Sequence, residues 1–344
     1  MGNGLISTIY IEREVTETPH LAERLQGLAQ RYPQAEQIGC ERYAEVFNRK
    51  AQNFRLQKLN PSLIVARKHR GRVLPSPPEY RIGDGEGYYF SHLLNCLYDC
   101  RYCFLQGMYR SAHYVWFLNY EEFAEDIRAL AEQGPSWFYS GYDCDSLALD
   151  PVTGFANFAL DLFASLPDHA HLELRTKSTQ IRPLLAREPL SNVITAFSFT
   201  PEPVSEHLED KVPSVDKRLA AMVKLQQAGW PVGLRLDPLI YTRDYLNQYR
   251  QLFQTLFNHP DHELDAERLH SVSLGAFRLP KGYFETMRKL YPEEKLFAGP
   301  LQQRGGMVSY EQALEEQMLA EVEQALLEHI PQRCYFPCPL PQPA

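Results

Sequence analysis

From Gly87 onward, short runs of β-branched and aromatic residues alternate with longer segments whose apolar residues recur every three or four positions. This alternation is typical of β-α units, in which a helix connects two neighbouring parallel strands. The strands are expected at residues 87–93, 136–141, 171–178, 192–200, 231–240 and 270–279. The helices are expected at residues 120–133, 155–166, 214–229, 246–259 and 281–291. Six such strands predict an α/β fold in which the sheet forms a partial (β/α)6 barrel or stays open.

The chain divides into three predicted regions. Residues 1–80 combine a strand at 7–12 and a helix at 19–32 with a proline-bearing stretch that is typical of a linker. We expect them to form an N-terminal α/β extension that packs on a core of residues 81–330. Residues 331–344 are rich in proline, and this tail is expected to lack regular structure.

Cysteine usage indicates a reducing compartment. The chain has seven cysteines in 344 residues, an odd number that is concentrated in one short stretch. This argues against a secreted disulfide framework and for thiols that serve a metal or catalysis. We find no basic leader followed by an apolar signal, and no apolar run reaches the ~20 residues of a bilayer span. We therefore expect a cytoplasmic protein without a membrane partner.

The net charge of the chain limits how it can bind nucleic acid. With 35 basic and 43 acidic side chains the formal net charge is -8. A negative protein is repelled by a phosphate backbone, so contacts spread over the whole surface are excluded. Any nucleic-acid site must then be a local patch of basic residues.

Three cysteines, Cys96, Cys100 and Cys103, lie within eight positions, directly after the first strand of the alternating region. Thiolates this close on one loop can converge on a soft metal centre. A structural zinc normally takes four ligands, usually from two Cys-x2-Cys hooks, and this loop supplies only one hook. His92 is the nearest further ligand, but its place inside an apolar strand favours a packed histidine. One alternative is therefore a zinc-stabilised nucleic-acid-binding module without catalytic activity.

An iron–sulfur cubane with three cysteine ligands keeps one iron open for an exogenous ligand. The Cys-x3-Cys-x2-Cys spacing resembles the signature of the radical S-adenosylmethionine superfamily. The resemblance implies a [4Fe-4S] cluster, bound S-adenosyl-L-methionine and a 5′-deoxyadenosyl radical. It also implies an electron donor such as flavodoxin or ferredoxin. Tyr102, directly before the third cysteine, resembles the residue that lies near the adenine of the cofactor.

Several longer phrases resemble the spore photoproduct lyase family over nearly the whole chain. They are NCLYDCRYCFLQG, SLALD, RTKS, FSFTPE, VPSVDKRLAAMVKLQQAGWPVG and QRGGMVSYEQA. The resemblance implies a partial barrel of the radical S-adenosylmethionine type and an enzyme that splits a thymine-dimer lesion, so damaged DNA becomes the expected partner. A radical enzyme acting on a small molecule or a protein side chain is the alternative, favoured by the acidic charge.

The same resemblance suggests residues that hold the cofactor. Lys177 resembles the family lysine that meets the cofactor's carboxylate, a role that suits a cation. Ser198 resembles another position of the cofactor pocket. Ser140 and Gly141 fall where the superfamily places small residues against the methionine end of the cofactor. The alternative for each is an ordinary residue at a strand end.

The hydrogen-donor region departs from the family pattern. Members return a hydrogen atom to the product radical from a cysteine after the second strand, with two tyrosines relaying the radical. An alignment on DSLALD without a gap puts Tyr142 at that place and Cys144 two positions later. Either a two-residue slip makes Cys144 the donor, or the donor is missing and Tyr142 acts otherwise. One expected tyrosine appears as Phe104, so the catalytic candidates are Cys144, Tyr142 and Tyr102.

Two smaller groups of residues follow later strands. Arg235 and Asp237 lie two positions apart on one strand, so their side chains share one face and either line the barrel interior or form a buried ion pair. Arg278, Arg304 and Tyr310 form the candidate DNA edge, with cations for the phosphates and a ring for base stacking.

Overall fold

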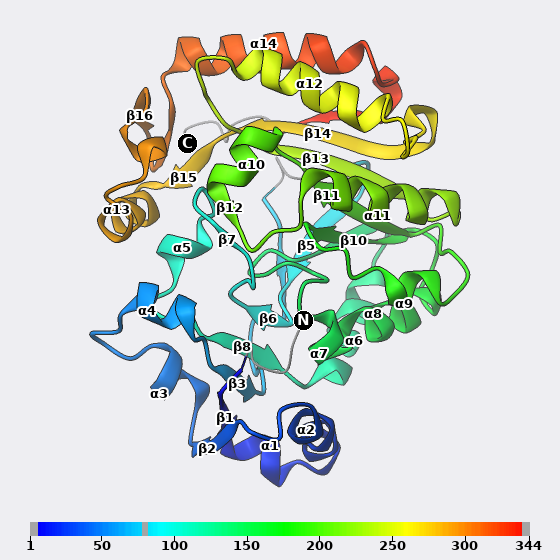
Figure 1. Cartoon of the computed structure of the whole chain (residues 1–344). Coiled ribbons are helices and arrows are strands. Elements are labelled where there is room, and N and C mark those ends of the chain that lie inside the picture. The colour runs from blue at the N-terminus through cyan, green and yellow to red at the C-terminus, as the bar shows by residue number, and fades with distance from the viewer. Residues whose placement is uncertain (1–5, 78–81, 339–344) are drawn as a thin grey trace.

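The computed structural model describes residues 6–77 and 82–338 (Figure 1). Its main feature is an eight-stranded sheet that curls into half a barrel, with its helices on the convex side. The strand order is β18-β14-β13-β11-β10-β9-β5-β4, and every neighbouring pair except β4 and β5 is parallel. The bounds are β4 Val73–Pro75, β5 Glu86–Phe90, β9 Ser136–Ser140, β10 Ala170–Thr176, β11 Val193–Ser198, β13 Val232–Leu239, β14 Leu269–Ala276 and β18 Tyr335–Pro337.

The six strands expected from the sequence are neighbours in this sheet, so the predicted α/β partial barrel is confirmed. They form because their residues are apolar on both faces, as a parallel strand covered by helices requires. In β11, for example, all six side chains from Val193 to Ser198 are buried. Strands β4 and β18 extend the sheet at its two edges and were not predicted.

Strand β18 corrects the expectation for the tail. Residues 335–337 pair in parallel with β14, and the backbone N–H of Cys338 donates to the Leu274 carbonyl at 2.9 Å. Pro337 is the last residue of this short strand and does not break the pairing, because an edge strand needs hydrogen bonds on one side only. The expected absence of regular structure is therefore wrong for residues 332–337, and residues 339–344 lie outside the described part of the chain.

The predicted helices are present and lie against the sheet with their apolar faces. They are α6 Tyr120–Ala131, α8 Phe155–Ala164, α11 Val215–Gln227, α12 Tyr245–Phe257 and α13 Lys281–Leu290, followed by α14 Gln312–Leu327. In α11 the buried stripe includes Leu219, Met222 and Val223, and Ser214 caps the first turn by accepting from the backbone N–H of Lys217. Among the described residues, no helix is long and apolar enough to cross a membrane.

A second sheet of five strands lies beside the half barrel (Figure 1). Its order is β2-β1-β3-β8-β6, with β1 Thr8–Glu12, β2 Glu36–Cys40, β3 Leu63–Ala66, β6 Leu93–Leu94 and β8 Tyr114–Phe117. Helix α2, Pro19–Arg31, packs beside it, as predicted for residues 19–32. Because β6 and β8 come from beyond residue 80, this sheet ties the N-terminal segment to the chain on both sides of the cysteine loop.

Two small antiparallel sheets complete the open side of the half barrel. Strand β7, Asp99–Cys100, pairs with β12, Glu209–Asp210, and so joins two segments that are far apart in sequence. Strands β15 Arg278–Pro280, β16 Leu301–Arg304 and β17 Met307–Tyr310 form a three-stranded sheet with a hairpin turn at Gly305. Strands β9, β10 and β11 have their carboxyl ends near the first of these sheets. In parallel α/β proteins the active site lies at the carboxyl ends of the strands.

Candidate active site at the strand ends

The three cysteines lie on the loop between β6 and helix α5, Leu105–Met108. Cys100 is buried, Cys96 and Cys103 are half-buried, and none of them is in a disulfide. The loop turns at Asn95, whose backbone has a φ of 66°, a left-handed conformation that asparagine tolerates better than most residues. The Asn95 amide donates to the carbonyls of Ser111 and His113 at 2.8 and 2.7 Å, which fixes the start of the loop.

His92 lies at the foot of this loop as a packed side chain, which agrees with the reading preferred from the sequence. It is 2% exposed, and its ring stacks on Phe155 with centroids 3.7 Å apart. Burial, with a further contribution from the Lys68 charge, lowers the pKa of His92 to about 3. His92 therefore stays neutral and serves the core.

The middle of the loop is anchored by β7. Cys100 is paired with Glu209 in the β7–β12 ladder, and the backbone N–H of Arg101 donates to the Leu208 carbonyl at 2.8 Å. The neighbouring Asp99 is buried and accepts from Gln106 at 2.7 Å and from Arg101 at 2.9 Å. The position of the cysteines thus depends on the segment that carries Glu209.

Glu209 is the centre of a buried hydrogen-bond network. Its carboxylate accepts from the Tyr102 hydroxyl, from Thr200 at 3.0 Å and from Ser205 at 2.8 Å. It also forms ion pairs with Lys177 and Arg218, at 3.1 and 2.9 Å. Burial opposes ionisation of this group, but the charges of Lys177 and Arg218 prevail and lower the pKa of Glu209 to about 2. The carboxylate is therefore charged at neutral pH, in an interior where a charge must be paired.

Lys177 directly follows β10 and extends toward the cysteine loop. Its ammonium lies 5.7 Å from the centre of the Tyr102 ring in addition to its ion pair with Glu209. Its side chain is 13% exposed and that of Glu209 is 0% exposed, so the cation is the accessible member of the pair. The two sequence candidates Lys177 and Tyr102 are thus brought together at one place.

Ser140 and Gly141 end strand β9 in a tight turn. The Ser140 and Ser146 hydroxyl oxygens lie 2.7 Å apart. Gly141 has a φ of 87°, and a Cβ atom built there would meet the Ser146 oxygen at 2.6 Å. The loop is further held by buried Asp145, which accepts from the backbone N–H of Lys177 at 2.6 Å and from the Thr176 hydroxyl at 2.7 Å. These contacts tie the end of β9 to the end of β10.

Ser198 ends strand β11 and is 6% exposed. Its carbonyl accepts from the buried Arg218 guanidinium at 2.8 Å, and the same guanidinium reaches Glu209. Lys177 and Ser198 lie at equivalent positions, because Thr176 of β10 is paired with Phe197 of β11. The candidate cofactor residues on β9, β10 and β11 therefore lie along one rim of the half barrel.

Comparison with known proteins identifies this arrangement. The family model for spore photoproduct lyase matches residues 87–332, which is well over half of the chain and includes the cysteine loop. The chain belongs to the spore photoproduct lyase family.

Two curated members of the spore photoproduct lyase family can be aligned. The spore photoproduct lyase of Bacillus subtilis (strain 168) is 27% identical over 207 residues, and that of Geobacillus sp. (strain Y412MC61) is 28% identical over 213 residues. Each alignment covers 58% of this chain and 59% of the relative. The chain thus spans about three fifths of the length of the curated relatives it matches.

A solved structure shows that the fold is shared over a longer stretch. A spore photoproduct lyase double mutant with bound AdoMet and dinucleoside spore photoproduct has a TM-score of 0.83 at 18% sequence identity. The match covers 99% of this chain and 100% of that chain. The half barrel and the flanking five-stranded sheet therefore belong to the fold of that protein as well.

The two hydrogen-donor candidates, Cys144 and Tyr142, lie in different parts of the structure. Cys144 is 5% exposed, and burial raises the pKa of its thiol well above the usual value, with a further contribution from the Cys96 charge. Tyr142 is 42% exposed, and its ring lies against Tyr89 and Phe104 with centroid distances of 4.5 and 5.3 Å. The two candidates thus have different surroundings. Cys144 lies in the interior behind the cysteine loop, whereas Tyr142 lies in an aromatic group at the rim.

The pair Arg235 and Asp237 does not form. Arg235 instead binds Glu173 of β10 at 2.7 Å, and both side chains are 1% exposed. Burial opposes ionisation of Glu173, but Arg235 and Arg175 prevail and lower its pKa to about 2. Asp237 lies 4.0 Å from Arg278. The two residues share a face, as alternation predicts, but each has its partner on a neighbouring element.

The predicted DNA edge is not assembled as expected. The Arg304 guanidinium donates to the Ser309 hydroxyl at 2.8 Å and to the Glu315 carboxylate at 2.7 Å, so its charge is paired within the protein. Tyr310 is 1% exposed, and its hydroxyl accepts from the backbone N–H of Tyr241 at 2.7 Å. Arg278 donates to the Cys338 sulfur at 2.9 Å and has a side chain that is 6% exposed. The structure therefore offers no exposed ring at Tyr310.

Sequence reasoning missed Glu209 and Arg218. A signal for Arg218 was present, because Val215, Arg218, Leu219 and Met222 have the spacing of one helical face. An arginine on an otherwise apolar face needs a buried partner, and that partner is Glu209. Glu209 itself follows a short helix in a polar stretch, where no pattern distinguishes a buried glutamate from an exposed one.

Proposed function

We propose that the chain is a radical S-adenosylmethionine enzyme that acts on a thymine photoproduct in DNA. The proposal is supported by its membership of the spore photoproduct lyase family and by the names of its curated relatives. A [4Fe-4S] cluster and S-adenosylmethionine, when bound and reduced, supply a 5′-deoxyadenosyl radical. An electron donor such as flavodoxin or ferredoxin would supply the reducing electron.

The cysteine loop fits an iron–sulfur cluster. Three thiols without disulfides lie on one loop, and the Lys58 and Lys177 charges lie within electrostatic range of it. Cationic side chains favour a ligand set of thiolates, which carries a high negative charge. Cys96, Cys100 and Cys103 would hold the cluster and leave one iron open.

The rim beside the loop fits the polar groups of S-adenosylmethionine. Lys177 is the cation for the carboxylate, and its ammonium already lies at hydrogen-bond distance from one carboxylate, that of Glu209. Ser140 and Gly141 would line the methionine end of the cofactor, and Tyr102 would lie near its adenine. Ser198 would line the cofactor pocket at the end of β11. Glu209 keeps Lys177 and Tyr102 in place through direct contacts.

One observation carries this proposal: the strand pair β7–β12 places Cys100 opposite Glu209, whose side chain binds Lys177. The residues expected to hold the cluster and the residue expected to hold the cofactor are thereby parts of one network. A zinc module would need the cysteine loop but would have no use for Lys177 at its side.

We assign the return of hydrogen to Cys144. In this step the S–H bond of Cys144 breaks, a C–H bond forms on the product radical, and the unpaired electron moves to sulfur. A thiol suits this role because its S–H bond is weak. Cys144 lies behind the cysteine loop and is held in place by its neighbour Asp145, whereas Tyr142 is at the exposed rim. Tyr102 and Tyr142 would then serve as relay residues.

DNA would meet the protein at helix α13 and the hairpin β16–β17. Lys281, Arg288 and Lys289 on α13 are exposed, unlike Arg304 and Tyr310. Exposed cations can bind phosphates without losing a partner inside the protein. Arg278 is the first residue of β15, which directly precedes α13, and its guanidinium lies 4.0 Å from the Asp237 carboxylate.

The experiment is repair of a defined lesion under anaerobic conditions. The chain is reconstituted with iron and sulfide, reduced, and given S-adenosylmethionine with an oligonucleotide that contains one spore photoproduct. We expect intact thymines, measured by mass spectrometry, from this substrate and none with the Cys100→Ala variant. Formation of 5′-deoxyadenosine that does not depend on the lesion, without thymine release, would overturn the DNA substrate and favour the small-molecule alternative.

A further inference from the structure

A second group of possible metal ligands lies away from the cysteine loop. It consists of Asp216 in the first turn of α11 and of His259 and His262 in the connection from α12 to β14. Among the described residues it is the one set of three histidine, cysteine or acidic side chains whose ligand atoms all lie within 4.8 Å of one another.

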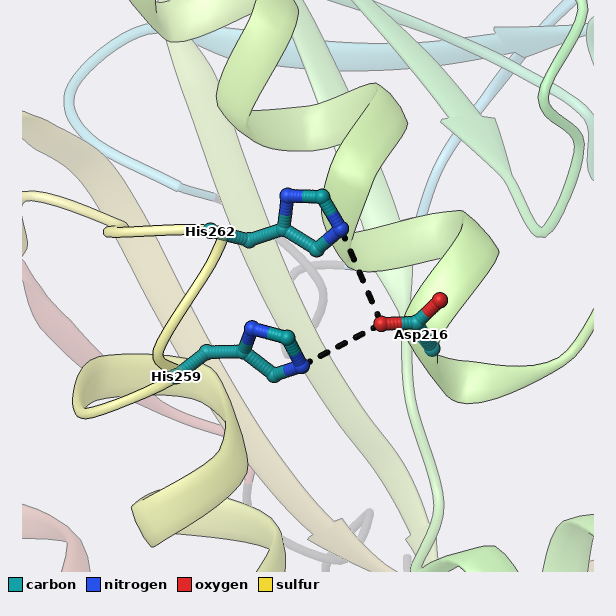
Figure 2. A group of neighbouring side chains, drawn as sticks. All are labelled: Asp216, His259 and His262. Atoms are coloured by element: carbon teal, nitrogen blue, oxygen red, sulfur yellow. Dashed lines mark ion pairs between the residues drawn. The ribbon is translucent and has the colours of Figure 1, made fainter.

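The geometry of this group directs two imidazoles at one carboxylate. Figure 2 shows the Nε2 atoms of both histidines pointing to the same oxygen of Asp216. The distances from Asp216 Oδ1 are 3.2 Å to His259 and 3.7 Å to His262. The two rings are nearly parallel, with centroids 4.8 Å apart. Donor atoms of a tetrahedral site with bonds of about 2.0–2.1 Å lie roughly 3.3 Å from one another, so the two oxygen–nitrogen distances are close to those of a filled site.

The side chains are accessible without being free in solvent. The histidines are 17% and 28% exposed, whereas Asp216 is 57% exposed. The rings are therefore largely fixed by their surroundings, and an ion can still enter from the side of the carboxylate. Pre-arranged ligands with an entry path are what a metal site requires.

The loop also shows what must change when a metal binds. The backbone N–H of Asp261 donates to His259 Nδ1 at 3.1 Å, so in this form the ring proton lies on Nε2 and points to Asp216. A neutral imidazole that ligates through Nε2 carries its proton on Nδ1. Binding would therefore move that proton and open the short turn from His259 to Asp261, which lies at the surface.

We infer that Asp216, His259 and His262 bind a divalent transition-metal ion, with Zn²⁺ as the best match. Two imidazoles and one carboxylate suit zinc, while the hard ions Mg²⁺ and Ca²⁺ prefer oxygen ligands only. Water would take the fourth position. The bound ion joins the α12–β14 connection to the start of α11, and it is unrelated to the three cysteines and to the proposed reaction.

The test is a calorimetric titration of the cluster-loaded protein with Zn²⁺ under anaerobic conditions. Loading occupies the cysteine loop, so that its thiols do not compete. We expect about one equivalent to bind, at least tenfold more weakly after Asp216→Asn or His262→Ala. His207→Ala is the control, since His207 is an exposed histidine that lies 3.5 Å from the Glu294 carboxylate and outside this group. The melting temperature should rise with Zn²⁺ in the parent and in the control but not in His262→Ala.

Cobalt gives an independent readout of the ligands. Co²⁺ in a site of nitrogen and oxygen ligands shows weak visible bands without the intense sulfur-to-cobalt absorption of a thiolate site. Equal Zn²⁺ affinity in the parent and in both site variants, or no binding at millimolar Zn²⁺, would overturn the assignment. Sulfur-to-cobalt absorption in the cluster-loaded protein would instead locate the ion at a free cysteine and would also overturn it. Because the three side chains lie at the surface, the variants are expected to fold, which circular dichroism checks.

Discussion

Glu209 and Lys177 form an ion pair of 3.1 Å that links the strand behind the cysteine loop to the end of β10. The glutamate is fully buried, and Arg218, its second cationic partner, is also fully buried. The pair therefore has two roles. It holds the cysteine loop through β12, and it presents the lysine at the rim of the half barrel.

Replacing Glu209 tests how much this buried network contributes to the stability of the fold. Glu209→Gln removes the charge that pairs with Arg218 and Lys177, and an unpaired buried cation destabilises a protein by about 3–5 kcal/mol. The control is Asp210→Asn, which removes the neighbouring carboxylate from an ion pair with Arg101 where Asp210 is 53% exposed. This change should cost less than about 1 kcal/mol. Urea unfolding of the two variants checks the difference, and equal stability would show that the network contributes nothing.

The pH dependence of unfolding should report the second buried pair. The pKa of Glu173 falls from its usual 4.5 to about 2 in the folded chain, after burial and the Arg235 charge are both counted. A lowered pKa stabilises the fold above pH 4.5, and that contribution, on the order of 3 kcal/mol, is lost as the pH falls from 4.5 toward 2. Glu173→Gln should flatten the unfolding free energy in that range. An unchanged slope in the variant would rule out this source.

Gly141 is expected to tolerate no side chain. Gly141→Ala would place a methyl group 2.6 Å from the Ser146 oxygen on a backbone with a φ of 87°. We expect a loss of about 1–3 kcal/mol of unfolding free energy and weaker binding of S-adenosylmethionine. Gly282→Ala is the control, because nothing lies within 4 Å of its Cβ position in helix α13. Equal stability of the two variants would show that the turn after β9 is not constrained.

Cys144 and Tyr142 can be distinguished by the ratio of two products. Cys144→Ala should reduce thymine release more than tenfold while 5′-deoxyadenosine still forms, because hydrogen abstraction would continue without hydrogen return. Tyr142→Phe keeps the ring that lies against Tyr89 and Phe104 but removes the hydroxyl of the proposed relay, so thymine release in a single turnover should change by less than threefold while repeated turnover slows. The opposite pattern would make Tyr142 the donor and would leave Cys144 as a core residue.

The DNA surface predicts a specific salt dependence. Lys289→Ala should weaken binding to lesion-containing and undamaged duplexes alike, and should lower the slope of log K against log salt by about 1. Arg304→Ala should leave the slope unchanged, because that guanidinium is bound to Glu315 at 2.7 Å. Fluorescence anisotropy at several salt concentrations measures both. A change of slope for Arg304→Ala and none for Lys289→Ala would place the phosphate contact at Arg304 and not on helix α13.

Much of the fold was predictable because its strands are apolar on both faces. The run Val193 to Ser198 has no polar face, and its β-branched and aromatic residues favour a strand buried between helices and a barrel interior. Strand β18 was not predictable, because a three-residue edge strand that ends in a proline has no periodicity to detect. The pairing of β7 with β12 was not predictable either, because two-residue strands carry no pattern.

Residue type and family resemblance indicated part of the candidate site. Three cysteines at close spacing limit the options to a soft metal centre, and Lys177 was found through a family phrase. The direction in which the Tyr310 ring points was not predictable. It depends on whether the alternating strand β17 turns that ring toward Tyr241 and Phe277 or toward solvent, and the structure turns it inward.

The most direct test of the account is the amount of 5′-deoxyadenosine formed per chain by the reconstituted, reduced protein with S-adenosylmethionine, compared with Cys100→Ala. If the three cysteines hold a cluster with an open iron beside Lys177, the parent forms 5′-deoxyadenosine and the variant forms none. Protein shown to contain four irons and four sulfides per chain that forms no 5′-deoxyadenosine would contradict the account.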